Sequence, residues 1–175
     1  MKLYVIPSWY PTEIKPESGS FFRNRALMLH SDGIDTTVIS VVQHSFKNIL
    51  SFKKISNIDY NDNGMHTYIY QNINIYPKLE KKSFYRYQKH AIRGLHKTIA
   101  KEGIPDAVFF QSSLLGAAAL WLELRKLNIP FFVSEHLKEF MPNYNFSKFQ
   151  NELISKVYDF STTIIAPSKA LQKSI

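Results

Sequence analysis

Short apolar runs rich in β-branched residues alternate with longer amphipathic stretches from one end of the chain to the other. The runs predict strands at 3–6, 36–42, 65–70, 73–76, 106–111, 130–134 and 162–166. Helical spacing of apolar residues predicts helices at 20–33, 83–102, 114–127 and 147–160, with a further helix opening at Ser168. Continuous apolar strands separated by such helices imply a parallel sheet covered on both faces. Right-handed crossovers then give an α/β fold with a doubly wound, Rossmann-like parallel sheet.

Composition narrows the class of protein. The chain has 175 residues, of which 45% are hydrophobic and 21% charged, which predicts one globular domain. It has no cysteine, which excludes disulfides and thiolate sites, and its six scattered histidines do not suggest a metal site. No apolar run has the length of a membrane span, and the first residues do not resemble a signal peptide. We therefore expect a cytoplasmic location.

The glycines exclude several kinds of phosphate and nucleophile site. No two of the six glycines form Gly-x-Gly, and the chain has neither a Walker A loop nor a Gly-x-Ser-x-Gly elbow. Dinucleotide-dependent redox chemistry, P-loop phosphoryl transfer and elbow-type hydrolysis are therefore disfavoured.

One loop nevertheless leads into a helix in a way that suits an anion. Gly19 lies just before the predicted helix, Ser20 is its expected N-cap, and Arg23 and Arg25 lie in its first turns. Unpaired N–H groups and the helix dipole at that end favour a diphosphate. Alternatively, this is an ordinary capped helix whose glycine serves the loop geometry.

Four segments, in this order, resemble bacterial family 4 glycosyltransferases. They are PSWYPT at 7–12, GSFF at 19–22, VSEH at 133–136 and IIAPSK at 164–169. The resemblance covers nearly the whole chain and implies the N-terminal, acceptor-side Rossmann half of a GT-B enzyme, occupying residues 1–175. Such enzymes move a sugar from a nucleotide-sugar to an acceptor with retention at the anomeric carbon, without an essential metal or other cofactor.

The same resemblance assigns site residues. His136 would contact the donor sugar, and Glu135 would orient either His136 or an acceptor hydroxyl, or else only pair with a lysine. Gly19, with Ser20 and Arg23, would lie at the donor diphosphate. The donor-binding C-terminal domain is expected to be absent from this chain, so the isolated residues should not catalyse. A departing diphosphate can accept the acceptor's proton, which fits a sequence without an obvious acid/base pair.

Topology adds acceptor-side candidates. Gln111, Ser112 and Ser113 follow the predicted strand at 106–111 and would face the same cleft as Gly19, because parallel strands end at one edge of the sheet. The expected acceptor is a saccharide, either a cell-envelope polysaccharide or a lipid-linked sugar.

The predicted helix at 83–102 has a basic side. Its cations and those just before it are three or four residues apart, which places them on one face: Lys78, Lys82, Arg86, Lys89, Arg93 and Lys97. With a net charge of +8, such a helix suits an anionic membrane surface at the inner face of the cell membrane, with Lys82, Arg86, Lys89 and Arg93 as the contact. A solvated outer helix is an equal alternative.

Two other classes of protein compete with the enzyme. One is a non-catalytic Rossmann-like domain that binds nucleotides or a partner. The other is a basic nucleic-acid-binding module, which the pattern of aromatic residues disfavours because it matches no RNA- or single-strand-binding motif. We therefore expect no nucleic-acid partner.

Overall fold

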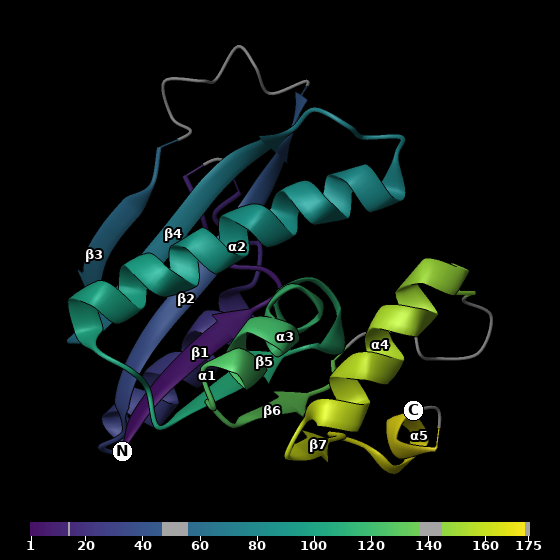
Figure 1. Ribbon diagram of the computed structural model, residues 1–175. Coiled ribbons are helices and arrows are strands. Elements are labelled where there is room, and N and C mark those ends of the chain that lie inside the picture. Colours follow the sequence, from purple (N-terminus) through teal and green to yellow (C-terminus); the bar gives the residue numbers. More distant parts are fainter. Residues whose placement is uncertain (14, 47–55, 137–144, 174–175) are drawn as a thin grey trace.

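The computed structural model describes residues 1–13, 15–46, 56–136 and 145–173. Its centre is a seven-stranded sheet of order β3-β4-β2-β1-β5-β6-β7 (Figure 1). The strands are β1 (Lys2–Pro7), β2 (Asp35–Ser45), β3 (Ile58–Asp62), β4 (Met65–Asn74), β5 (Ala107–Gln111), β6 (Phe131–Ser134) and β7 (Thr163–Ile165). All neighbouring pairs are parallel except β3 with β4. The predicted doubly wound α/β fold is confirmed.

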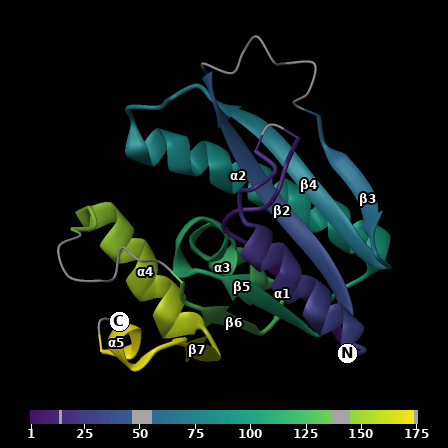
Figure 2. The ribbon, with the colours of Figure 1, turned by 180° about the vertical axis from the view of Figure 1, so that it is seen from behind.

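Helices cover both faces of this sheet. They are α1 (Ser20–Ser31), α2 (Glu80–Glu102), α3 (Ala118–Lys126), α4 (Lys148–Phe160) and α5 (Lys169–Gln172). Figure 1 shows α2 and α3 in front of the sheet, and Figure 2, seen from behind, shows α1 on the opposite face. The final helix was predicted to open at Ser168, and residues 174–175 of that prediction lie outside the described residues.

The alternation of side chains along β1 explains why the sheet is covered on both sides. Tyr4 and Ile6 belong to the core shared with α2 and α3, whereas Leu3 and Val5 belong to the core that Ala26 of α1 enters. Successive side chains of a strand point to opposite faces, so a strand apolar at every position must be buried twice. Leu3, Tyr4, Val5 and Ile6 are all 2% exposed or less.

Three local predictions were wrong. The predicted strands at 65–70 and 73–76 are one continuous strand, β4, because its pairing with β2 runs unbroken from His66 to Asn74. The antiparallel edge strand β3 was not predicted, because its alternation is polar and most of it is exposed. Ser20 is not the N-cap of α1: Gly19 occupies that position without a side-chain cap.

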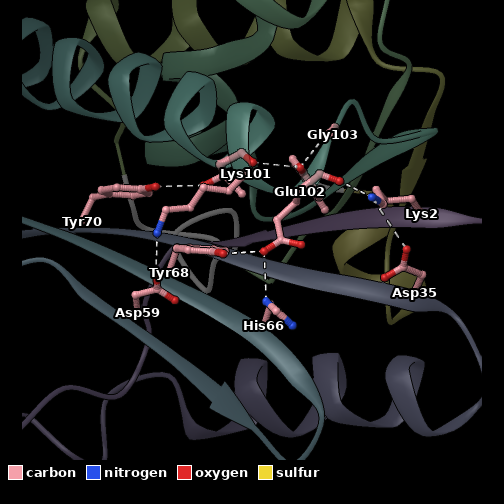
Figure 3. A network of polar contacts seen from close by, with 11 residues as sticks. Lys2, Asp35, Asp59, His66, Tyr68, Tyr70, Lys101, Glu102 and Gly103 are labelled. Atoms are coloured by element: carbon pink, nitrogen blue, oxygen red, sulfur yellow. Dashed lines mark hydrogen bonds and ion pairs between the residues drawn. The ribbon is translucent and has the colours of Figure 1, made fainter.

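A polar clasp fixes the amino-terminal edge of the sheet, away from the predicted site (Figure 3). The carboxylate of Glu102, at the end of α2, accepts a hydrogen bond from the Tyr68 hydroxyl and lies 3.0 Å from His66 Nδ1. Beside it, Lys101 Nζ lies 2.5 Å from Asp59 of β3. The clasp thus ties α2 to both strands of the β3–β4 hairpin.

The connection from β5 to α3 is an irregular turn. Residues Ser113–Ala117 precede α3, where the sequence predicted a helix from 114 onward. Leu115 has φ 59° and ψ −99°, and Ser112 has φ 154°, both sparsely populated conformations for residues with a side chain. Such backbone persists only when neighbouring groups hold it in place, and it commonly occurs at functional edges.

Candidate functional site

The carboxyl ends of β1, β5 and β6 form the edge where the predicted site residues gather. β1 lies between β2 and β5. The crossover through α1 places β2 on one side of β1, and the later crossover through α2 places β5 on its other side. Ligands of doubly wound sheets bind at such a switch point, beyond the carboxyl ends of the strands. At this edge are the loop after Pro7, the N-terminus of α1 and residues 134–136 after β6.

His136 lies in a cluster that α1 builds. Arg25 Nη1 is 2.7 Å from His136 Nε2 and 3.1 Å from Ser134 Oγ, and Ser134 Oγ is 2.9 Å from the same ring nitrogen. The rings of Phe21 and Phe22 meet the imidazole edge-to-face, with centroids 5.5 and 5.7 Å away. The imidazole is therefore fixed both by polar contacts and by packing.

These contacts define the protonation of His136. A guanidinium only donates hydrogen bonds, so Nε2 accepts and the ring proton is on Nδ1. Burial, followed by the charge of Arg25, lowers the pKa of His136, while Glu135 opposes the shift. His136 is thus neutral at pH 7 and offers an Nδ1–H donor.

Arg25 is the residue that sequence reasoning undervalued. Its guanidinium lies over the Phe109 ring, 5.1 Å from the centroid, and burial lowers its pKa. A helix turns by about 100° per residue, so Arg23 and Arg25 flank the buried side of α1 on opposite sides. That spacing separates the two cations, but only the strand order shows which of them meets His136.

Arg23 has a different partner. Its Nε and Nη2 donate to both carboxylate oxygens of Asp62 at 2.7 and 2.6 Å, and Asp62 is buried. This bidentate pair raises the pKa of Arg23 and joins α1 to the end of β3. The predicted role of Arg23 at a diphosphate stays a prediction, but the structure gives its charge a partner within the protein.

The loop that leads into α1 requires a glycine at position 19. Its φ is +74°, and a Cβ at this position would lie 2.2 Å from the Trp9 carbonyl oxygen. The close backbone approach is therefore between two turns of this chain. Gly19 and Ser20 still place the N-terminus of α1 at the predicted edge, and a diphosphate contact there stays a prediction.

Glu135 is completely buried and holds three elements together. Its Oε2 accepts from the Ser113 N–H and the Tyr158 hydroxyl, both at 3.1 Å, and its Oε1 accepts from the His136 N–H at 3.0 Å. Burial, followed by the charge of Glu135, raises the pKa of Tyr158, so its hydroxyl remains a donor. Of the expected roles, orientation of His136 fits this geometry. The predicted contact with an acceptor hydroxyl and the alternative pairing with a lysine stay predictions.

The three acceptor-side candidates lie at the expected edge but below the surface. Gln111, Ser112 and Ser113 are each 1% exposed or less. The Gln111 amide donates to the Phe22 carbonyl at 3.4 Å, whereas its oxygen and Ser112 Oγ have no partner among the described residues. None of the three lines either of the two cavities at this edge, so their predicted contact with an acceptor stays a prediction.

Two adjoining cavities open at this same edge. The large cavity, of about 480 Å³, lies between the starts of α2 and α4 and the turn at Leu114 and Leu115. The small cavity, of about 260 Å³, lies between the loop after β1 and the end of β2. They share Ser8, Trp9, Gln43, Tyr87 and Leu115. Within the described ranges, no group of three or more His, Asp or Glu side chains could hold a metal ion.

Solved structures share this fold. A UDP-GlcNAc 2-epimerase from Methanocaldococcus jannaschii aligns with a TM-score of 0.56 at 19% identity, covering 99% of this chain and 41% of that one. LpCGTa in complex with UDP gives 0.57 at 11% identity, covering 99% and 49%. Arabidopsis thaliana UGT89C1 in complex with UDP gives 0.54 at 15% identity, covering 96% and 43%.

These likenesses show the fold of the chain and leave its family open. No protein-family model matches the sequence, and the comparison with curated proteins gives no match. The chain spans less than half the length of each of the three structures. At these identities, the finding is that the chain has the Rossmann-like arrangement of a GT-B domain.

Proposed function

We propose that this chain forms the acceptor-side half of a retaining, family 4-type glycosyltransferase that uses a nucleotide-sugar donor. The observation that carries the proposal is the fixed, neutral His136 beside the N-terminus of α1, at the edge where the two cavities open. The Nδ1–H of this uncharged imidazole has no partner among the described residues. It can donate to a sugar hydroxyl without repelling a developing positive charge at the anomeric carbon. Solved structures of the same fold that hold UDP support a nucleotide donor.

In the proposed reaction, the acceptor hydroxyl attacks the anomeric carbon as its bond to the diphosphate breaks. The departing diphosphate takes the proton, so no protein base is needed. Orientation of both sugars and stabilisation of the leaving group supply the rate enhancement. His136 would orient the donor sugar, and the N–H groups at Gly19 and Ser20 would face the diphosphate.

The proposal assigns most donor contacts to a second domain, so the 175-residue chain should bind nucleotide-sugars weakly and transfer no sugar. We expect a Kd for UDP-glucose and related donors of about 1 mM or weaker. Titration followed by amide chemical shifts should nevertheless perturb Gly19 and His136. Sugar transfer by these residues alone would contradict this division of labour. Unchanged amides at this edge with every nucleotide-sugar, together with salt-sensitive binding to random DNA, would instead support the nucleic-acid alternative.

We further propose that the start of α2 rests on an anionic membrane. No helix in the described part of the chain has the length and apolar character to cross a bilayer. Lys82, Lys89 and Arg93 are exposed, whereas Arg86 is half-buried and donates to the Ile73 carbonyl at 2.9 Å. The pKa of His90 between them is lowered by burial and then by the neighbouring cations. Exposed apolar side chains adjoin this basic face: Ile75, Tyr76, Leu79 and Tyr85.

Replacing Lys82 and Lys89 with Gln should weaken binding to vesicles containing anionic lipid. Each cation near such a surface contributes about 1 kcal/mol, so the double variant should bind about 30-fold more weakly at low salt. Vesicle sedimentation measures this effect. The matched control replaces Lys156 and Lys169, which are exposed on α4 and α5, and removes the same charge. Equal losses in both double variants, or no loss in either, would leave only a solvated helix face.

A further inference from the structure

The large cavity is mainly apolar and aromatic. Its apolar walls come from α2, α4, the β5–α3 turn and the loops between them: Trp9, Pro77, Phe84, Tyr87, Leu114, Leu115, Phe146, Phe149 and Leu153. Phe84 and Phe149 meet edge-to-face across it, with centroids 5.4 Å apart. A volume of about 480 Å³ lies within the range of small-molecule sites.

The mouth of this cavity is held open by polar contacts. Ser147 caps α4, and its hydroxyl also donates to the Glu80 carboxylate of α2 at 2.9 Å. Ser8 Oγ donates to the Leu114 carbonyl at 3.4 Å, which ties the β1 loop to the turn. The two helix starts and the turn are thus fixed by bonds outside the apolar walls, so the space between them is part of the fold.

A buried hydroxyl without a partner lies where the two cavities meet. Tyr87 is 3% exposed, lines both cavities, and its hydroxyl has no hydrogen-bond partner among the described residues. Burial raises the pKa of Tyr87, so the hydroxyl is a donor at any physiological pH. Buried polar groups are nearly always paired in native proteins, and an unpaired one calls for a bound water or ligand.

The small cavity is more polar than the large one. Thr12, Lys15, Ser18 and His44 line it, and His44 Nε2 lies 2.6 Å from the Gln71 side-chain oxygen. A ligand extending from the large into the small cavity would pass from apolar walls to hydroxyl and amine groups. The Tyr87 hydroxyl lies between these two environments.

We infer that the joined cavities bind an amphiphile whose aliphatic or aromatic segment fills the large cavity and whose polar oxygen accepts a hydrogen bond from Tyr87. Its glycosyl or other polar head then lies in the small cavity. The identification of this amphiphile as the sugar acceptor rests on the proposed function, whereas the binding site itself does not. On that basis, the sugar acceptor carries an apolar group, and a fully polar polysaccharide end does not fill the site.

Alkyl β-glucosides below their critical micelle concentrations test this inference directly. Methyl glucoside should not bind measurably, and affinity should then rise about threefold to fourfold for each methylene buried between hexyl and octyl. Calorimetry on the 175-residue chain measures the series. Affinity that does not depend on chain length would overturn the inference.

Tyr87→Phe isolates the hydroxyl. The variant should bind octyl glucoside about fivefold to tenfold more weakly, because one buried hydrogen bond is lost. Its Tm should not fall, since the wild-type hydroxyl has no hydrogen-bond partner to lose in the described part of the chain. Tyr85→Phe is the matched control: Tyr85 lies on the same helix, is 57% exposed and lines neither cavity, so binding should not change.

The outcomes separate this inference from the proposed function. Wild-type affinity in Tyr87→Phe would show that water alone satisfies the hydroxyl and would overturn the inference. Chain-length-dependent binding that needs Tyr87, without transfer from any nucleotide-sugar by a protein containing this chain, would leave the amphiphile site standing and refute the enzyme.

Discussion

Replacing Glu135 with Ala should lower the free energy of unfolding by about 3 kcal/mol, because one buried and two half-buried donors lose their common acceptor. Those donors are the Ser113 and His136 N–H groups and the Tyr158 hydroxyl. The Ser113 N–H is buried together with Glu135, which is 0% exposed, so solvent does not replace the lost acceptor there. Glu135→Gln keeps one acceptor oxygen but aims an amide donor at groups that also donate, so about half of the loss should remain.

Urea unfolding of the two variants gives these differences, and Glu152→Ala is the matched control. Glu152 is exposed on α4, so its removal should change stability by no more than about 0.5 kcal/mol. Hydrogen exchange should also become faster at residues 112–117, because the Glu135–Ser113 bond fixes a turn with strained backbone. If Glu135→Ala were as stable as the control, the carboxylate would not hold the turn.

Most of the sheet could be predicted because its buried strands have a recognisable composition, rich in apolar and β-branched residues. The run at 3–6 is apolar throughout, the run at 36–42 is β-branched apart from Ser40, and the run at 106–111 is apolar between its two end residues. A strand buried on both faces favours such patterns. The edge strand β3 escaped prediction for the converse reason: Asp59, Tyr60 and Asn61 are exposed, and a solvated edge has no apolar signature. Its existence depends on pairing with β4 and on the clasp at Glu102, both of which are tertiary contacts.

Helix ends were less predictable than helix bodies. Ser20 is a favourable N-cap by residue type, yet Gly19 takes the position because only a residue without Cβ fits against the Trp9 carbonyl. That contact joins residues ten apart through a loop, so no local pattern contains it. By contrast, Ser147 and Gln150 form a capping box in which both partners are local, and the start of α4 was predicted within one residue.

The position of the candidate site could be predicted more easily than the contacts that its residues make. The rule that parallel strands end at a common edge placed Gly19, Gln111 and His136 together, and they do share that edge. It could not show that Gln111 lies beneath the surface or that Tyr87, from the middle of a helix, reaches the cavities. Both depend on how the β5–α3 turn folds over the sheet. The positive φ angles of Ser112 and Leu115 in and beside this turn could not be predicted, because neither residue type favours them.

The role of His136 follows from its support. Phe21 and Phe22 pack against the ring, and Arg25 and Ser134 occupy Nε2, whereas Nδ1–H has no partner among the described residues. Burial and then the charge of Arg25 lower the pKa of His136, so the folded state favours the neutral ring. The sign of the linkage follows: this contribution to stability is present above a pH of about 6.5 and is lost as the pH falls below the unfolded-state pKa.

His136→Ala should therefore lower turnover by about 10²–10³-fold, the loss typical of removing one positioned transition-state donor. The assay uses a protein in which this chain is joined to a donor-binding domain, with kcat measured beside thermal unfolding. Stability should change little, since the ring is half-buried at an edge and fills no core. His96→Ala is the matched control, because His96 is exposed and its ring nitrogen contacts Glu123, far from the candidate site, so the kcat of this variant should match the wild type.

Arg25→Gln tests the role of His136 through the pH dependence of kcat, which would not change if Arg25 had only a structural role. Without the guanidinium charge, the pKa of His136 should rise, and the acid limb of the kcat profile should move to higher pH in the same direction. Glu135, whose charge raises the pKa of His136, would then be opposed by burial and no longer by Arg25. A folded His136→Ala protein with wild-type turnover would make His136 a loop residue. An unmoved acid limb in Arg25→Gln would show that the ring's protonation does not limit the reaction.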